Sequence, residues 1–471
     1  MTPLRLAVVG HTNTGKTSLL RTLARRRDFG DVSPSPATTR RVEPLALLAG
    51  GEEVAVLLDT PGLEDSIGLL EAIDAMRHDR REDPQTSIER FLASEKARRR
   101  FPQEVAALEA ARSADLLLVV IDARDRVRPR HLDELEVLRR CGRPVVPLLN
   151  FVAAEGADAE AWRGGLARLG LHAVASFDVV VYDAEDEARL LEAVRTLVPD
   201  HRGAIDRLLE DRRVRRDSIR RATAAALGDL LVDAASLVVE VMPAPRGDPA
   251  IRRRLEEDAG EALRERLRTL ERRTHLEVLA LAGFDAADAK VAEAALADLS
   301  IGIDLFSPEA LRAMGFTAAT GAAAGAATGA AIDLAVGGLS LGAAAAIGAV
   351  IGGTLGAAGR QARRLLLLAR GGREVTAGDP TLLLLLRRAM TLVRGLEIRG
   401  HAAVEPLAVG TTPGKDASRR EDERLAAIVM PLLRAARSRL GHPAGEAGTS
   451  ASREDLRREV ARAIEDALRP R

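Results

Sequence analysis

The stretch Gly10-His11-Thr12-Asn13-Thr14-Gly15-Lys16-Thr17 decides how the N-terminal half of this chain is interpreted. The apolar run at residues 4–9 precedes it and predicts a β-strand, and the residues from Ser18 onward have the spacing and composition of a helix. The glycines of this G-x-x-x-x-G-K-T pattern allow successive backbone N–H groups to point at an anion, and the start of the helix adds partial positive charge. The strand, loop and helix therefore predict a loop that holds phosphate groups.

Two side chains of this loop have defined chemical roles toward a bound nucleotide. The Lys16 ammonium reaches the β- and γ-phosphates, and the Thr17 hydroxyl binds Mg²⁺. Further contacts are expected from the rest of the loop and the first helical residues, namely Gly10, Asn13, Thr14, Gly15 and Ser18. The sequence thus predicts a site for a nucleoside triphosphate and magnesium.

A second apolar run supports this interpretation. Residues 54–58 are unbroken Val, Ala and Leu, as expected for a strand that is buried on both faces, and they lead into Asp59-Thr60-Pro61-Gly62. An Asp at such a strand end holds magnesium through water, and Gly62 allows its backbone N–H to approach a γ-phosphate.

Three elements resemble the G1, G2 and G3 motifs of small bacterial GTPases, most closely those of the Era-like and TrmE-like branch: residues 10–17, Thr38-Thr39-Arg40 and residues 59–62. The resemblance implies an α/β P-loop NTPase (G) domain with a mostly parallel sheet, with GTP or GDP as ligand and Mg²⁺ as cofactor. It also implies that Thr39, or its neighbour Thr38, ligates Mg²⁺ in the triphosphate state. Catalytic roles are implied for Lys16, Thr39 and Gly62.

Two further positions bear on catalysis by resemblance. Leu63 stands where Ras-like proteins carry the glutamine that orients water. In the Era-like and TrmE-like branch a hydrophobic residue is usual there, and catalysis relies on other groups or on a potassium ion. Asn13 occupies the position associated with K⁺ in such relatives, and the alternative is that it only stabilises the loop. The group that activates water is therefore not assigned.

The base-recognition motif departs from the family pattern. GTPases carry Asn-Lys-x-Asp after the strand that corresponds to residues 144–150, and the aspartate accepts two hydrogen bonds from guanine. Here the residues are Asn150-Phe151-Val152-Ala153, so only Asn150 is retained. Guanine preference is inferred from the rest of the resemblance, and an ATP-using switch is the weaker alternative. Asp183-Ala184 falls where relatives carry Ser-Ala against the base, and it is equally consistent with an ordinary strand-to-helix loop.

Composition and hydrophobic spacing divide the chain into three parts. Residues 1–200 form the expected G domain, with a charged helical insertion at about 65–110. Residues 201–440 form a mostly α-helical C-terminal region, in which 201–242 and 251–282 have the recurrence of long helices. Residues 441–471 are a Gly-, Ala- and Ser-rich linker followed by a short charged helix.

The segment 313–359 has the most unusual composition. Asp333 is its only charged residue, and its glycines recur at fourfold spacing, which lets helices approach closely. We expect an Ala/Gly-rich helical hairpin with arms of about twenty residues, long enough to cross a bilayer. Because Ala and Gly contribute little transfer energy, a buried soluble hairpin and membrane association, through reversible insertion rather than stable spanning, are equally good interpretations.

Charge and composition exclude several classes of function. The chain has 471 residues with 69 Lys and Arg against 69 Asp and Glu, so a net charge of zero argues against a nucleic-acid partner. Aromatic residues make up 2%, which argues against a base-stacking surface. The single cysteine, Cys141, excludes an internal disulfide framework, in agreement with a reducing compartment. We expect a cytoplasmic protein, peripheral to or reversibly inserted at the inner membrane if residues 313–359 associate with lipid.

These features predict a GTPase of low intrinsic rate that acts as a Mg²⁺-dependent molecular switch. Its partner would be an unknown protein or a membrane process, and a nucleotide-dependent homodimer is a further expected form. The alternative is a dynamin-like mechanochemical GTPase at a membrane, for which the long helices and the apolar hairpin are the motivating features.

Overall fold

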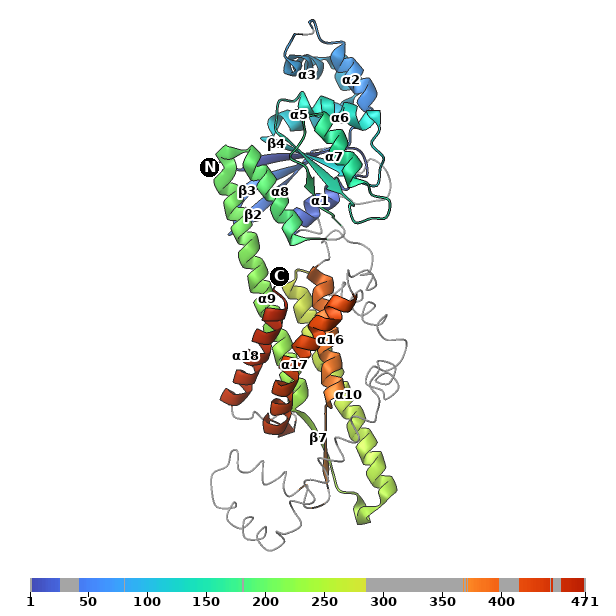
Figure 1. Cartoon of the computed structure of the whole chain (residues 1–471), viewed down its shortest axis with the longest axis vertical. Coiled ribbons are helices and arrows are strands. Elements are labelled where there is room, and N and C mark those ends of the chain that lie inside the picture. The colour runs from blue at the N-terminus through green and yellow to red at the C-terminus, as the bar shows by residue number, and fades with distance from the viewer. Residues whose placement is uncertain are drawn as a thin grey trace. The chain divides into compact units, whose positions relative to one another are not determined.

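The computed structural model describes residues 2–25, 42–79, 81–179, 182–284, 367, 370, 372–397, 415–440, 442–443 and 450–469 (Figure 1). The chain divides into two compact units, one comprising Met1–Asp217 and Glu397–Glu405, the other Ser218–Leu396 and Pro406–Arg471. The expected hairpin at 313–359 and the loop that contains Thr38 and Thr39 lie outside the described residues.

A six-stranded sheet forms the centre of the first unit. Its order is β2-β3-β1-β4-β5-β6, and all neighbours are parallel except β2 and β3, which are antiparallel. The mostly parallel α/β sheet expected from the sequence is thereby confirmed. The strands are β1 (Leu4–Val9), β2 (Glu43–Ala49), β3 (Glu52–Asp59), β4 (Leu116–Asp122), β5 (Val145–Asn150) and β6 (Ala175–Ser176).

Both faces of this sheet are buried, which explains its continuous apolar strands. Along β1, Leu6 and Val8 join one hydrophobic cluster, while Ala7 and Val9 join the cluster on the opposite face. The first cluster includes residues of α1 (Lys16–Ala24), α8 (Ala184–Leu197) and the start of α9 (Arg202–Ser236). The second includes residues of α5 (Pro102–Ser113), α6 (Pro129–Arg139) and α7 (Ala159–Arg168). The 3₁₀ turn η1 (Pro199–His201) leads into α9.

The insertion expected at about 65–110 coincides with helices α2 (Ser66–Asp74), α3 (Pro84–Ala93), α4 (Glu95–Arg100) and α5. Helix starts are capped by side chains: Asp65 accepts from Gly68 N, and Asp83 accepts from Gln85 N next to Pro84. The insertion contributes buried residues such as Phe91 to the second cluster. It therefore shares the hydrophobic core of the sheet.

The second unit is helical with a small sheet. One hydrophobic cluster joins the end of α9 to α10 (Pro249–Leu281), α16 (Asp379–Glu397), α17 (Lys415–Leu440) and α18 (Ser450–Ala467). The expected helix at 201–242 ends at Ser236, because the Val-rich segment β7 (Leu237–Val241) pairs instead as the central strand between β8 (Arg373–Thr376) and β9 (His442–Pro443). The turn η2 (Pro245–Gly247) separates β7 from α10.

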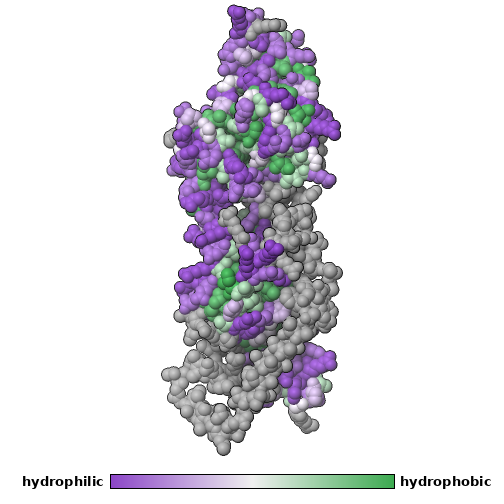
Figure 2. All heavy atoms as spheres, viewed as in Figure 1, coloured by the Kyte–Doolittle hydropathy of each residue, from purple (hydrophilic) through white to green (hydrophobic). Residues whose placement is uncertain are grey.

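On the face drawn in Figure 2, hydrophilic residues are interspersed with smaller hydrophobic areas over the described surface. Among the described residues, no helix combines the length and the apolar character that a membrane span requires.

Candidate functional site

The loop after β1 has the backbone geometry that its glycines predict. Gly10 has a φ of 143° and Gly15 a φ of 92°, both in the region that favours glycine. A Cβ at Gly10 would collide with the carbonyl oxygen of Val120, and a Cβ at Gly15 would collide with the side-chain amide of Asn150. Asn13 also has a positive φ, 65°, and its side chain is exposed.

Lys16 lies against the loop that it follows. Its Nζ donates hydrogen bonds to the carbonyl oxygens of Gly10 at 2.9 Å and His11 at 2.7 Å, and the residue is 8% exposed. Burial lowers the pKa of Lys16, and the negative charges of Asp59, Glu134 and Glu64 oppose that shift. The side chain of Lys16 is therefore held against the loop.

Asp59 and Thr17 meet because β1 and β3 are neighbouring parallel strands. The register pairs Val8 with Asp59, which places the end of β3 beside the loop. Thr17 Oγ1 donates to Asp59 Oδ2 at 2.9 Å, and Asp59 is 1% exposed. Hydroxyl and carboxylate oxygens are the hard ligands that Mg²⁺ prefers, so the donor set at this point fits magnesium.

The segment after Asp59 packs on the loop at three points. A Cβ at Gly62 would lie 2.6 Å from Thr12 Oγ1, so only glycine fits there without a shift of the loop. His11 Nδ1 lies 2.8 Å from the carbonyl oxygen of Leu63, and Thr12 Oγ1 donates to Glu64 Oε1 at 3.3 Å. The Leu63 side chain is fully buried in the second cluster. Leu63 therefore contributes an apolar side chain to the core. It carries no group that could orient water.

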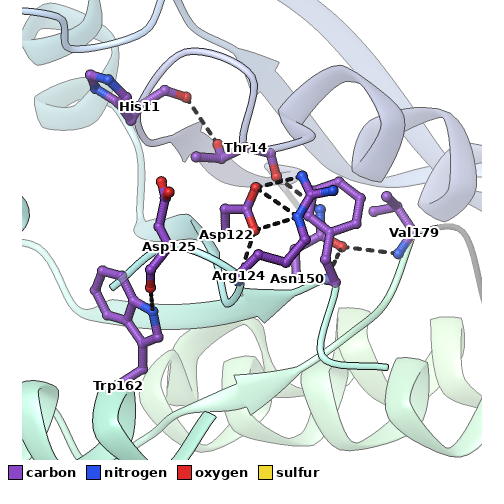
Figure 3. Close-up of polar contacts among 9 residues, drawn as sticks. His11, Thr14, Asp122, Arg124, Asp125, Asn150, Trp162 and Val179 are labelled. Carbon is purple, nitrogen blue, oxygen red and sulfur yellow. Dashed lines mark hydrogen bonds and ion pairs between the residues drawn. The ribbon is translucent and has the colours of Figure 1, made fainter. Parts of the chain in front are cut away.

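Asn150 connects three segments at the end of β5 (Figure 3). Its Nδ2 donates to the carbonyl oxygen of Thr14 at 2.8 Å, and its Oδ1 accepts from the backbone N–H groups of Phe151 at 2.9 Å and Val179 at 3.1 Å. Asn150 is fully buried. The retained asparagine thus joins the phosphate loop to the segments that follow β5 and β6.

An aromatic and a guanidinium group stack beside Asn150. Phe151 has a φ of 58°, and the Arg124 guanidinium carbon lies 4.0 Å from the centre of its ring. Asp122 accepts from Arg124 Nε at 2.9 Å and from Arg124 Nη2 at 2.7 Å, as Figure 3 shows. The hydrogen bonds to Asp122 raise the pKa of Arg124. No local sequence motif marks Arg124 or Asp122 as residues of this site.

A buried carboxyl group lies behind the phosphate loop. Glu134 of α6 is 5% exposed and shares a pocket with His11, Thr14, His131 and Trp162. Burial raises the pKa of Glu134 to about 7, and the positive charges of Lys16 and Arg130 oppose that shift. No local sequence motif marks Glu134 as a buried acidic residue of α6.

The remaining expected site residues are placed as follows. Ser18 lies in the first turn of α1, so it is adjacent to Thr17 in the loop-to-helix junction. Thr39 lies outside the described residues. The Asp183 carboxylate caps α8 by accepting from Glu185 N at 2.7 Å.

Comparison with known proteins matches two parts of the chain to two different families. Residues 5–151 match the family model described as a 50S ribosome-binding GTPase. The tRNA modification GTPase MnmE of Halorhodospira halophila is 36% identical over 34% of this chain and 28% of its own length, and the GTPase Der of Geobacter sp. strain M21 is 31% identical over 33% and 29%. The chain thus spans less than a third of the length of these relatives. A solved structure of Era in complex with MgGDPNP and nucleotides 1506–1542 of 16S ribosomal RNA is 20% identical over 42% of this chain and 58% of that chain, with a TM-score of 0.31.

The larger match covers the second half. Residues 163–466, from within α7 to within α18, match the family described as a domain of unknown function, DUF3482. This match spans more than half of the 471 residues. The chain therefore belongs to the DUF3482 family and carries an Era/TrmE-like P-loop GTPase domain at its N-terminal end.

Proposed function

We propose that this protein binds GTP and hydrolyses it to GDP and phosphate as a Mg²⁺-dependent molecular switch. The observation that carries the proposal is the meeting of Lys16, Thr17 and Asp59 at a glycine-bounded loop, with Thr17 Oγ1 and Asp59 Oδ2 2.9 Å apart. A phosphoryl-transfer site depends on positioning and on charge stabilisation, and these groups supply both. The match of residues 5–151 to a GTPase family supports it.

Each residue has one role in the proposal. The backbone N–H groups of the loop and the Lys16 ammonium bind the phosphates. Thr17 and Asp59 hold the magnesium ion, Asp59 through water, and Thr39 is the proposed further ligand in the triphosphate state. Bound there, Mg²⁺ would offset the charge on the β- and γ-phosphate oxygens. Gly62 packs against Thr12, and its backbone N–H would donate to the γ-phosphate.

The segment from Asp59 to Glu64 is the proposed switch. It contacts the phosphate loop through the His11 and Thr12 side chains and continues directly into α2. A γ-phosphate that attracts the Gly62 N–H would compete with these contacts, so nucleotide state would be transmitted to the helical insertion.

Calorimetric titration with Mg·GTP and Mg·ATP tests the proposal. We expect binding of GTP in preference to ATP, and loss of binding in Lys16→Ala, because the buried ammonium is the cation nearest the phosphates. Lys96→Ala, which removes an exposed lysine from α4, is the matched control and should bind as the wild type does. Retained GTP binding in Lys16→Ala, or a preference of the wild type for ATP, would contradict the proposal.

What the switch controls is a finer proposal. We infer that the switch controls a protein partner or a membrane process. We also propose that the chain forms a nucleotide-dependent homodimer and lies peripherally at the inner membrane. The dynamin-like alternative depends on residues 313–359, outside the described residues. Sedimentation with anionic vesicles separates the two: a mechanochemical protein pellets with the vesicles and hydrolyses GTP faster on them, whereas a simple switch shows the same rate with and without lipid.

A further inference from the structure

The loop after β5 lacks the carboxylate that GTPases use to read guanine. Ala153, an exposed residue, stands three positions after Asn150, where the family motif carries aspartate. Guanine offers an N1–H and a 2-amino group side by side. A site that leaves both donors without an acceptor loses its means of rejecting adenine, which has neither group.

The neighbouring strand brings a different carboxylate to this position. β5 and β6 are parallel, with Leu149 opposite Ser176, so the segments that follow them leave the same edge of the sheet. Two hydrogen bonds hold the segment after β6: Phe177 N donates to Leu149 O at 3.0 Å, and Val179 N donates to Asn150 Oδ1 at 3.1 Å. The residue between them is Asp178.

Asp178 lies against the backbone of Ala153. Its Oδ2 accepts from Ala153 N at 3.5 Å, and the residue is 6% exposed. The carboxylate is therefore next to the backbone from which the motif aspartate would project. Its negative charge also acts on Arg124, the residue that stacks on Phe151.

Phe151 adds a flat surface to the segment that follows β5. It occupies the lysine position of the motif, and a Cβ at Gly15 would lie 3.4 Å from its Cζ atom, so the ring borders the phosphate loop. Aromatic rings bind nucleobases by stacking on their faces without selecting among them. Arg124 covers one face of the Phe151 ring. A base stacked on the other face would gain affinity from the ring, and selectivity would have to come from a hydrogen-bonding group.

We propose that Asp178 replaces the missing motif aspartate and selects guanine by accepting hydrogen bonds from its N1–H and 2-amino groups. The inference rests on the proposed GTP binding and assigns its specificity to the segment after β6. Adenine is disfavoured because its bare ring nitrogen offers the carboxylate no hydrogen-bond donor and turns a lone pair toward the negative charge.

Asp178→Asn tests the proposal by a change of specificity. The amide keeps an oxygen for Ala153 N, and it accepts from N1–H while donating to a carbonyl at C2, which is the pattern of xanthine. We expect GTP affinity to fall by about 100-fold or more and xanthosine triphosphate to become the preferred ligand. Asp183→Asn, five positions further along in the cap of α8, is the matched control and should leave the preference unchanged.

Ala153→Asp gives a second test at an exposed position. If Asp178 already reads guanine, a second carboxylate beside it repels the first and weakens GTP binding, and the double variant with Asp178→Asn recovers GTP binding. If the wild-type site has no reading carboxylate, Ala153→Asp instead strengthens GTP binding, and this result overturns the inference. Unchanged GTP preference in Asp178→Asn also overturns it. A wild-type chain that binds no GTP overturns the proposed function as well, so the two failures are distinguishable.

Discussion

Replacing Asn150 with alanine removes the side chain that joins the phosphate loop to the ends of β5 and β6. Three hydrogen bonds are lost, at 2.8, 2.9 and 3.1 Å, all from a fully buried group. At about 1 kcal/mol of net stability for each buried bond, the first unit should lose roughly 3 kcal/mol. For a domain of about 200 residues, this corresponds to a fall in Tm of roughly 6–12 °C.

The fluorescence of Trp162 measures this change in the first unit, which contains Asn150. Trp162 is the only tryptophan in the chain and is 2% exposed in the first unit, so its emission reports on the unfolding of that unit alone. Thr196→Ala is the control, because it removes one exposed side-chain bond to Glu192 O at 2.9 Å in α8 and should shift Tm by about 2 °C or less. A shift for Asn150→Ala no larger than that of the control would refute the role assigned to Asn150.

Two further predictions concern charge at the phosphate loop. Because the pKa of Glu134 is raised from 4.5 to about 7, the stability that this group contributes is fully present below pH 4.5 and is lost as pH rises through 7. Glu134→Gln should therefore be more stable than the wild type at pH 8, by up to about 3 kcal/mol, and the difference in stability should shrink toward pH 5. Urea unfolding of both proteins at the two pH values measures this difference. A difference that is the same at both pH values would contradict the prediction. Replacement of K⁺ by Na⁺ should slow GTP hydrolysis in the wild type and have no effect in Asn13→Ala, because Asn13 is the proposed K⁺ ligand; phosphate release in the two salts measures this, and equal wild-type rates would remove that role.

The phosphate loop could be predicted because its information is local. Eight consecutive residues between an apolar run and a helical pattern determine where the glycines, Lys16 and Thr17 fall. The Asp59 position was equally predictable, since it ends a continuous apolar strand, and the parallel pairing of β1 with β3 then brings it to Thr17. In both cases the pattern that forms the element also positions the chemical group.

The proposed base end of the site could not be predicted, because its groups come from three separate strand ends. Arg124 follows β4, Phe151 follows β5 and Asp178 follows β6, and only the register of the sheet brings them together. Asp183-Ala184 falls where relatives carry Ser-Ala against the base, and in the structure the Asp183 side chain caps α8. The last strand of the sheet ends earlier, at Ser176, so the segment beside Asn150 contains Asp178 instead.

In the second unit, too, local sequence patterns predicted the helices but not an element that depends on distant strand pairing. Apolar spacing predicted its long helices, and α10 extends over Pro249–Leu281 where residues 251–282 were expected to be helical. The short, mostly apolar segment Leu237–Val241 is compatible with either a helix end or a strand. It forms a strand because it pairs with β8 and β9, which are more than a hundred residues away in sequence.

Release of inorganic phosphate from GTP tests the central claim most directly. Purified full-length protein should release phosphate from GTP slowly, stop when EDTA removes Mg²⁺, and show no release from GTP in the Lys16→Ala variant. Under the same conditions ATP should be hydrolysed much more slowly or not at all. Phosphate release from GTP that is unchanged by Lys16→Ala, or equal hydrolysis of ATP and GTP, would contradict the assignment of this site as a guanine-specific GTPase centre.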